Sequence, residues 1–297
     1  MEMVAATKMR KSQEIALASR PYAFAALDFL ATLCGLDADK LPELFKVREV
    51  KRVLFVLVSS DKGLAGAFNS SIFRKFEKHQ KEFLNSEKGL GAGKEEHLFV
   101  AVGEKAFNYL SKKGFNIVKK FVAVGDYTTT EQAHPISDFI TSGYLENKWD
   151  RVIIISTHFR SALKQEPHVR RVLPIDFDHL EDTVKEIIPE RGKFADLIKE
   201  QQITFLQGKC ETKEILIEPA TGEVLNKLAE HLFFIQVYHL ILEANASEHS
   251  ARRMAMKTAS DNASDLGSAL NLQYNKSRQS RITTEISEIS AGAEALS

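Results

Sequence analysis

The chain has no proline and almost no glycine in its last quarter. No proline follows Pro219, and the only later glycines are Gly222, Gly267 and Gly292. Proline removes a backbone donor and glycine costs conformational entropy, so little in this region can end a helix that begins near residue 223. At ~1.5 Å per residue, this helix would be on the order of 110 Å long, far longer than a globular domain can cover. We therefore predict one unbroken C-terminal helix that projects from the rest of the chain.

Three further absences exclude classes of protein. The 40 basic and 40 acidic side chains cancel, so no net field favours nucleic acid as a partner. The two cysteines, Cys34 and Cys210, show no CxxC or Cys/His spacing, which favours reduced thiols over a disulfide framework or a zinc site. No apolar stretch reaches the ~20 residues that span a bilayer, so we expect no segment of this chain to insert into a membrane.

Small and apolar side chains form a seam on the predicted C-terminal helix. Alanines recur every four residues from Ala251 to Ala263, and the apolar residues near the end alternate in steps of four and three: Ile282, Ile286, Ile289, Ala293 and Leu296. This spacing keeps one side of a helix against a partner helix. The alanine-rich first 33 residues, which contain no glycine, supply a partner, with a kink expected at Pro21. The two ends are predicted to pair as an antiparallel coiled coil.

The segment between these helices has a different composition. Short β-branched runs alternate with amphipathic stretches, a pattern typical of an α/β domain. The runs lie at 53–59, 98–103, 152–156 and 215–217, and the amphipathic stretches include 70–84 and 104–112. Because the runs are continuously apolar, the strands should form a mostly parallel sheet that is covered on both faces. The predicted fold is an α/β, Rossmann-like domain (50–220) inserted into a long antiparallel coiled coil of an N-terminal helix (1–35) and a C-terminal helix (223–297).

One glycine-containing turn is the strongest candidate for a ligand site. The stretch SSDKGLAGAFN, Ser59–Asn69, follows a strand and precedes a helix, where a glycine loop could hold phosphate. It matches neither the dinucleotide fingerprint nor a Walker A loop. Gly63 and Gly66 more often serve a tight turn, with Asn69 or Ser70 as the N-cap of the following helix. We therefore favour a structural role for this turn.

Two other candidates are weaker. Gly89–Lys94 (GLGAGK) lacks the Ser or Thr that follows the lysine of a Walker A loop, so we expect a flexible loop there. Acidic and imidazole side chains gather at Asp176, Asp178, His179, Glu181 and Asp182, but no EF-hand glycine accompanies them. A solvated acidic loop or the start of a helix is the simpler interpretation. We predict no catalytic residue, no cofactor and no bound metal.

Basic side chains occur in groups on both predicted terminal helices: Lys8, Arg10, Lys11, Arg252, Arg253, Lys257, Lys276, Arg278 and Arg281. Such groups usually form only a solvated helix face. On an antiparallel pair of helices, however, they would surround a rod with positive charge. This arrangement suits transient docking against acidic loops of a surrounding protein.

Four segments resemble the gamma subunit of the F-type ATP synthase. They are MEMVAATKMRKSQ (1–13), SSDKGLAGAFN (59–69), ASEHSARRMAMKTASDNA (246–263) and YNKSRQSRITTEISEISAGAEAL (274–296). The strand-like RRVLPI (170–175) and residues 224–243 match more loosely. The resemblance implies a rotor, in which the paired terminal helices form the central stalk inside a hexamer of alternating alpha and beta subunits.

The resemblance also implies partners and a location. The α/β domain would sit with the epsilon subunit on the membrane ring of c subunits, with one copy per complex, as a peripheral protein on the cytoplasmic face of a bacterial membrane. Ion flow would turn the ring and the stalk, and the asymmetric stalk would change the affinity of each catalytic site for nucleotide. Catalysis would belong to the beta subunits, so the chain is expected to be non-catalytic and to regulate ATPase activity.

Individual positions carry over from the resemblance in two groups. Contacts with the surrounding subunits are implied for Met1, Lys8, Arg278, Gln279, Thr283 and Glu285, and an apolar bearing near the tip is implied for Ile282, Ile286, Ile289 and Leu296. Members of this family begin several helical turns upstream of MEMVAATK, so we expect that segment to be missing here. Residues 176–212 also look longer than the usual link.

Two other classes of function remain open. An α/β nucleotide-binding enzyme with helical appendages would need the turn at 59–69 to bind phosphate. A coiled-coil adaptor or a nucleic-acid binder is disfavoured, the latter because the charge is neutral and no aromatic side chains are interleaved with basic ones. The rotor hypothesis instead predicts no activity of the chain alone and co-purification with ATPase subunits.

Overall fold

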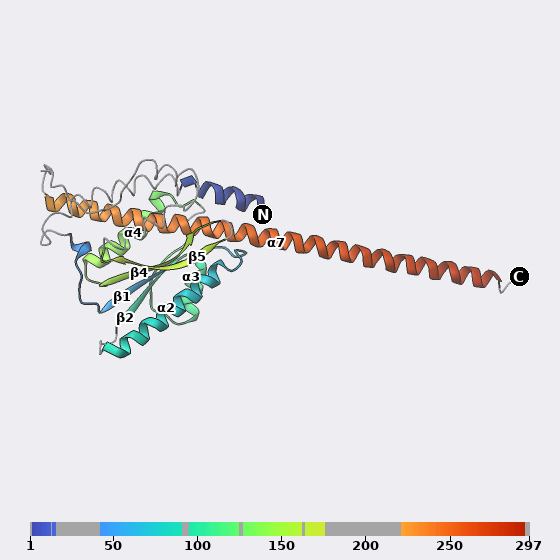
Figure 1. Cartoon of the computed structure of the whole chain (residues 1–297), viewed down its shortest axis with the longest axis horizontal. Helices are drawn as coiled ribbons and strands as arrows, with labels where there is room; N and C mark the ends of the chain where they lie inside the picture. Colours follow the sequence, from blue (N-terminus) through green and yellow to red (C-terminus); the bar gives the residue numbers. More distant parts are fainter. Residues whose placement is uncertain are drawn as a thin grey trace.

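The computed structural model describes residues 2–12, 14–15, 42–90, 95–124, 127–161, 164–175 and 221–294. This part of the chain contains one five-stranded sheet, helices on both faces of the sheet and one very long C-terminal helix (Figure 1). Some sequence predictions concern residues outside these ranges: the kink at Pro21, the two cysteines, the run at 215–217 and the acidic group at 176–182.

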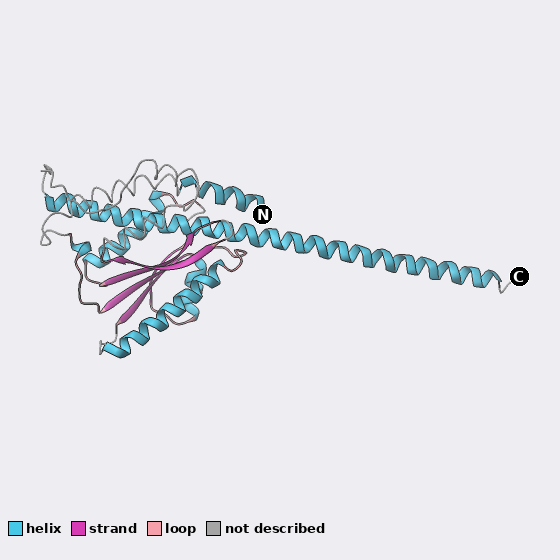
Figure 2. Ribbon diagram, in the orientation of Figure 1, coloured by secondary structure: helices cyan, strands magenta, loops and turns pink. Residues whose placement is uncertain are grey.

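The five strands lie in the order β3-β2-β1-β4-β5. Figure 2 shows them as one twisted sheet beside the long C-terminal helix. They are β1 (Arg52–Val58), β2 (Glu96–Val102), β3 (Ile117–Phe121), β4 (Arg151–Phe159) and β5 (Gln165–Leu173). The first four are parallel to one another, and β5 runs antiparallel to β4. Because β2 lies on one side of β1 and β4 on the other, the strand order reverses at β1.

Helices cover both faces of the sheet. On one face α2 (Phe68–Leu90) and α3 (Glu104–Lys112) pack over Phe55 and Phe99. On the other face lie α4 (Thr130–Leu145), the short helix η2 (Glu43–Phe45) and α7 (Thr221–Glu294), over residues such as Val56 and Ile154. The mostly parallel, doubly covered sheet that the apolar runs predict is confirmed.

Trp149 anchors the face that α4 and α7 cover. Its side chain is 1% exposed, and the indole Nε1 donates a hydrogen bond to the carbonyl of Ile140 at 3.0 Å. The indole lies against Gly143 of α4, where an added Cβ would come within 2.0 Å of the ring atom Cζ2. Glycine at this position therefore lets α4 approach the ring closely.

α7 is the predicted unbroken C-terminal helix, and it has two parts with different surroundings. From Leu232 to Ser250 every residue is buried or half-buried, and this part packs on the sheet and α4. From Lys257 to Ala293 every residue is exposed. We call residues 257–293 the protruding segment, which at ~1.5 Å per residue extends about 55 Å from the rest of the molecule (Figure 1).

The sequence patterns miss some elements of the fold. They do not predict β3 or α4, and they indicate only the end of β5. The loop expected at Gly89–Lys94 is wrong for its first two residues, because α2 continues through Leu90; residues 91–94 lie outside the described ranges.

Residues 2–12 form an N-terminal helix with one buried face. Ala5, Met9 and Ser12 are each at most 9% exposed, and their four-three spacing places them on one side of the helix. In Figure 1 this helix runs in the direction opposite to α7. Lys11 lies over the ring of Tyr127, with Nζ 4.7 Å from the ring centroid, so the helix is tied to the segment before α4.

Candidate functional site

The turn after β1 is the place where a doubly wound sheet usually binds a nucleotide. Ligands of such sheets occupy the crevice outside the carboxyl ends of the strands, at the point where the strand order reverses. In this chain that point lies at β1, so residues 59–67 are the natural candidate. Whether phosphate could bind there depends on which polar groups of the turn are free.

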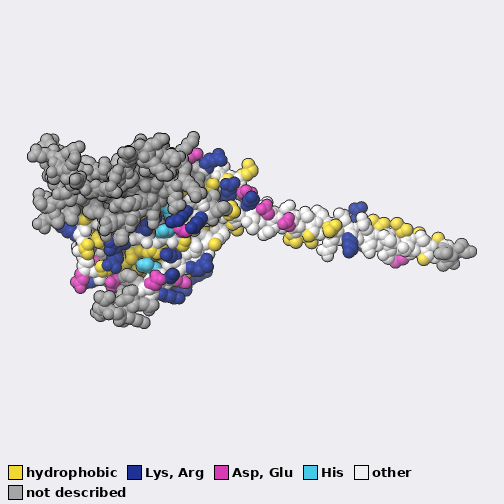
Figure 3. Space-filling view, viewed as in Figure 1, with side chains coloured by type: hydrophobic (Ala, Val, Ile, Leu, Met, Phe, Trp, Pro, Cys, Tyr) yellow, Lys and Arg dark blue, Asp and Glu magenta, His cyan; other side chains and the backbone are white. Residues whose placement is uncertain are grey.

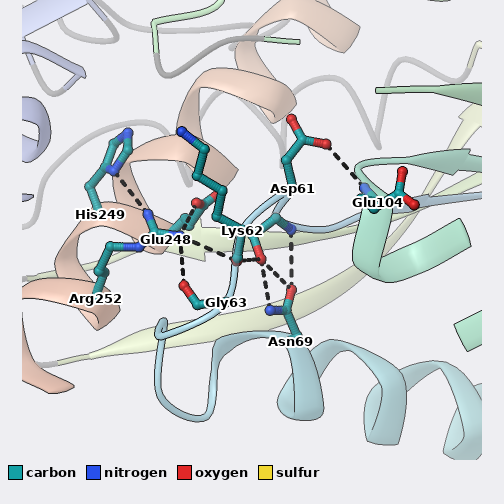
Figure 4. A network of polar contacts seen from close by, with 9 residues as sticks. Asp61, Lys62, Gly63, Asn69, Glu104, Glu248, His249 and Arg252 are labelled. Carbon is teal, nitrogen blue, oxygen red and sulfur yellow. Dashed lines mark hydrogen bonds and ion pairs between the residues drawn. The ribbon is translucent and has the colours of Figure 1, made fainter. Parts of the chain in front are cut away.

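The polar groups of this turn bond mainly to one another (Figure 4). Oδ1 of Asn69 accepts a hydrogen bond from the backbone N–H of Ser60 at 3.1 Å, and Oγ of Ser60 donates to the carbonyl of Lys62 at 2.7 Å. Oδ1 of Asp61 accepts from the backbone N–H of Glu104 at 3.0 Å, at the start of α3. Asn69 lies inside α2, so the expectation that it caps the helix is wrong; its side chain holds the turn instead.

α7 lies against the same turn. Nη2 of Arg252 donates to the carbonyls of Lys62 and Gly63, each at 3.4 Å. Gly66 adopts a φ of +57°, and a Cβ there would lie 3.5 Å from the Cβ of Ala255. The alanine seam of α7 therefore packs against the turn after β1 at Ala255. The role of this turn is to hold α7 in place.

The same helix also reaches the end of β4. Oγ of Ser247 donates to the carbonyl of Thr157 at 3.4 Å. The crevice between the ends of β1 and β4, which would hold a ligand in a nucleotide-binding relative of this fold, is thus occupied by α7. This geometry supports the tight-turn interpretation and gives the alternative of a nucleotide-binding enzyme no site at this position.

A pocket of about 460 Å³ lies between α2 and β5. It is lined by Lys75, Lys78, His79, Glu82, Glu166, Pro167, His168 and Val169. A hydrogen bond from Lys164 lowers the pKa of Glu166, so this carboxylate offsets the nearby positive charges. The lining therefore presents no concentration of one charge. In the ranges that the structure describes, no three His, Cys, Asp or Glu side chains are placed to hold a metal ion.

A buried polar cluster joins α7 to two strands of the sheet. It consists of Glu243 and His239 of α7, His158 of β4 and Arg170 of β5, and we call it the junction cluster. One carboxylate oxygen of Glu243, Oε2, lies 2.9 Å from Nδ1 of His158 and 3.8 Å from Nη1 of Arg170. The other, Oε1, lies 3.1 Å from Nε2 of His239. All four side chains are at most 9% exposed.

The surroundings of Glu243 keep its carboxyl group ionised. Burial alone would raise the pKa of Glu243, but the charge of His239 and the hydrogen bonds with His158 and His239 lower it below its ordinary value. The junction cluster is therefore a buried network in which Glu243 is hydrogen-bonded to His158 and His239 and lies within ion-pair distance of Arg170.

The contact residues implied by the resemblance are not brought together into one compact site. Arg278, Gln279, Thr283 and Glu285 are exposed on the protruding segment, where Oγ1 of Thr283 donates to the carbonyl of Gln279 at 2.9 Å. Lys8 is half-buried on the N-terminal helix, and Met1 lies outside the described residues.

The apolar residues of the protruding segment are exposed as well. Ile282, Ile286 and Ile289 are 44%, 59% and 73% exposed, and Leu266, Leu270, Leu272 and Tyr274 are each more than half exposed. Leu296 lies outside the described residues. Figure 3 shows hydrophobic side chains along this projecting helix among a few charged ones. Single exposed apolar residues are ordinary, but a long row of them on one helix marks contact with another protein.

Sequence reasoning does not identify the junction cluster. The available signal is His239 and Glu243, four residues apart, within an apolar run of the helix. Polar residues inside such a run usually bond to partners from elsewhere in the fold. The partners, however, lie on β4 and β5, some 70 to 85 residues earlier, and no local pattern marks them.

Comparison with known proteins gives a consistent result over the whole chain. A family model described as ATP synthase matches residues 1–296. The ATP synthase gamma chain of Bdellovibrio bacteriovorus is 34% identical over 296 residues, covering 100% of this chain and 92% of that protein. The ATP synthase gamma chain of Moorella thermoacetica is 35% identical with the same coverage.

Solved structures of similar fold come from mitochondrial ATP synthases. A chain in the central stalk and c-ring structure of the Tetrahymena thermophila enzyme has a TM-score of 0.54 at 24% identity, covering 88% of this chain and 97% of that chain. A chain in the OSCP, F1 and c-ring structure of the Euglena gracilis enzyme has a TM-score of 0.53 at 15% identity, covering 99% of this chain and 94% of that chain. At these identities the structures show a shared fold.

Proposed function

The chain belongs to the family of ATP synthase gamma chains, and we propose that it acts as the central stalk of the complex, a non-catalytic rotor. The observation that carries this function is the protruding segment. A helix whose residues are all exposed from 257 to 293, with apolar side chains along it, requires a surrounding protein to cover it. The occupied crevice at β1 also agrees with a role that does not involve binding nucleotide.

The N-terminal helix would pair with α7 as an antiparallel coiled coil. The opposite directions of the two helices and the single buried face of residues 2–12 support this pairing. The chain would then divide into an N-terminal shaft helix (1–35), a central α/β domain (50–220) and a C-terminal shaft helix (223–297). We use the word shaft for the two paired helices.

The proposed mechanism is mechanical. Two helices of different length and sequence form an asymmetric shaft, so each orientation presents different side chains to each surrounding catalytic subunit. A ligand or partner can shift a conformational equilibrium only through such differential contacts. Rotation driven by ion flow would change the affinity of each catalytic site for ADP, phosphate and ATP in turn, and hydrolysis would drive the same rotation in reverse.

The partners and location follow from this role. Alpha and beta subunits would surround the shaft, and the epsilon subunit and the c-subunit ring would hold the α/β domain, with one copy of the chain per complex. The chain would be peripheral to a bacterial membrane, on its cytoplasmic face. Among the described residues, no helix is long and apolar enough to cross a bilayer.

Contacts with the catalytic subunits would concentrate near the tip of the shaft. Arg278, Gln279, Thr283 and Glu285 would exchange polar contacts with loops of these subunits as the shaft turns. Met1 and Lys8, at the other end of the chain, would also lie against the surrounding subunits. The apolar residues Ile282, Ile286, Ile289 and Leu296 would form a bearing that slides against a ring of apolar side chains. Their exposure on the protruding segment, where the structure describes them, supports this assignment.

Reconstitution with partner alpha and beta subunits tests the proposed function. We expect one copy of the chain per hexamer and ATP hydrolysis that depends on the chain. A version that lacks residues 280–297 should assemble or turn over less well, because it loses the tip contacts. Failure of the full chain to assemble with the hexamer, even with an added upstream helical segment, would contradict the rotor function.

A further inference from the structure

Two stretches of the buried part of α7 are apolar around most of the helix, although Gln236 and His239 between them are buried and polar. Leu232–Ile235 and Leu240–Leu242 are runs of consecutive buried apolar residues, and consecutive residues point in directions about 100° apart around a helix. A helix that is apolar all round buries similar area at several angles of rotation about its own axis. Apolar packing therefore holds α7 on the sheet but specifies its rotation only weakly.

The junction cluster removes this ambiguity in the buried part of α7, and the hydrogen bonds of Asn245, Ser247 and Arg252 add to it further along the helix. In the observed orientation the carboxylate of Glu243 meets partners from β4 and β5 as well as His239 of its own helix. After a rotation of α7 the same carboxylate would face apolar side chains of the sheet, such as Val152 and Ile154, and would be desolvated without a partner. Burial of an unpaired charge is strongly unfavourable. A single buried polar residue fixes the register of coiled coils for the same reason.

The contacts of Glu243 are also placed to resist twisting. Rotation of a helix about its axis is opposed only by contacts that lie away from that axis, at the ends of side chains. Glu243 reaches His158 on β4 and Arg170 on the neighbouring strand β5, so a twist that carries its carboxylate away from the sheet must break buried contacts with both strands.

We propose that the junction cluster of Glu243, His239, His158 and Arg170 is a register lock that transmits torque between the α/β domain and the shaft. These are positioning residues that act through the shaft and do not touch nucleotide. The inference rests on the proposed function, because torque passes through this junction only if the chain is a rotor.

The lock acts on the tip of the shaft at a distance. α7 continues from Glu243 through the protruding segment without a break, so its angle at the sheet is carried to Arg278, about 50 Å further along the helix axis. A change of register at the junction would turn the tip contacts relative to the α/β domain. The expected consequence is loss of coupling with hydrolysis retained.

The test uses the complete ATP synthase, assembled with this chain and reconstituted in lipid vesicles. Two variants remove the lock in different ways. Glu243→Gln leaves the buried cluster without its anion. A triple variant, H158L with R170M and E243L, replaces the three members that join α7 to β4 and β5 by apolar side chains and retains His239 on α7. Apolar replacement of a buried ion network is often neutral or stabilising, so the triple variant should remain folded. Glu230→Gln is the matched control, because Glu230 is an exposed residue of the same helix above the sheet.

Two rates are measured on each vesicle preparation, ATP hydrolysis and the ion pumping that it drives, with both proton and sodium uptake followed. For both lock variants we expect hydrolysis close to wild type and a severalfold fall in ions pumped per ATP, with no change for the Glu230→Gln control. A stably folded triple variant that pumps poorly separates the lock from a simple contribution to stability. Pumping per ATP at the wild-type level in the triple variant would overturn the register lock.

The outcome also distinguishes this inference from the proposed function. If the wild-type chain supports hydrolysis-driven pumping and the lock variants do so equally well, the register lock is wrong and the rotor function stands. If the wild-type chain itself gives no pumping that depends on it, the rotor function fails and the lock fails with it.

Discussion

At the scale of single residues, Glu243 should make the stability of the chain depend on pH. Its pKa is lowered from an ordinary value of 4.5, so the unfolded chain takes up this proton at a higher pH than the folded chain. The stabilisation is therefore fully present above about pH 4.5 and is lost as the pH falls further. Urea unfolding followed by the fluorescence of Trp149, the single tryptophan, measures this dependence. Glu243→Gln should flatten it, whereas an equal acid dependence in wild type and variant would contradict the assignment.

Gly143 and Gly267 offer a second residue-scale comparison, because both lie in helices but in different surroundings. A Cβ at Gly143 would meet the ring of Trp149 at 2.0 Å, whereas nothing lies within 4 Å of a Cβ at Gly267. Gly143→Ala should cost about 1–3 kcal/mol through overpacking. Gly267→Ala should stabilise the helix by up to about 1 kcal/mol. Denaturant unfolding followed by circular dichroism measures whether each substitution lowers or raises the free energy of unfolding. No change for Gly143→Ala would mean that the indole moves aside easily.

At the scale of elements, α7 should divide into two parts of different local stability. Residues 232–250 are covered by the sheet and α4, whereas residues 257–293 are exposed on all sides. Isolated helices are marginal in water, and most helical stability in proteins comes from packing. In the chain alone, amide hydrogens of the protruding segment should exchange much faster than those of residues 232–250. Assembly with the hexamer should slow that exchange, and equally fast exchange in the complex would exclude a stable surrounding contact.

The elements that sequence predicts are those whose burial leaves a simple pattern. β1, β2 and β4 have buried cores of consecutive apolar residues, and α7 lacks any residue that stops a helix. β3 is an edge strand with two lysines, and most of β5 is only half-buried, so neither gives a continuous apolar run. The sequence also indicates the exposed residues of the protruding segment, because they lie on one continuous helix. It does not identify the junction cluster, because the geometry of that cluster arises only when β4, β5 and α7 come together.

At the scale of the whole molecule, the effect of a C-terminal truncation on folding should depend on whether the deletion starts after or before the part of α7 that packs on the sheet. Deletion from residue 257 onward removes only exposed helix, so the α/β part should keep its fold. Deletion from residue 221 onward also removes Phe233 and Leu240, which pack over the same core as Trp149, and uncovers one face of the sheet. An exposed apolar face of this kind favours aggregation.

Trp149 fluorescence and size-exclusion chromatography distinguish the two products. The shorter deletion should elute as a single folded species with a buried indole, and the longer one should aggregate or lose the blue-shifted emission. A soluble, folded product of the longer deletion would mean that the α/β domain does not need α7 in order to fold. In that product α7 would no longer occupy the ends of β1 and β4, so the crevice beside β1 would be open. Nucleotide binding by the truncated product would then be the next measurement.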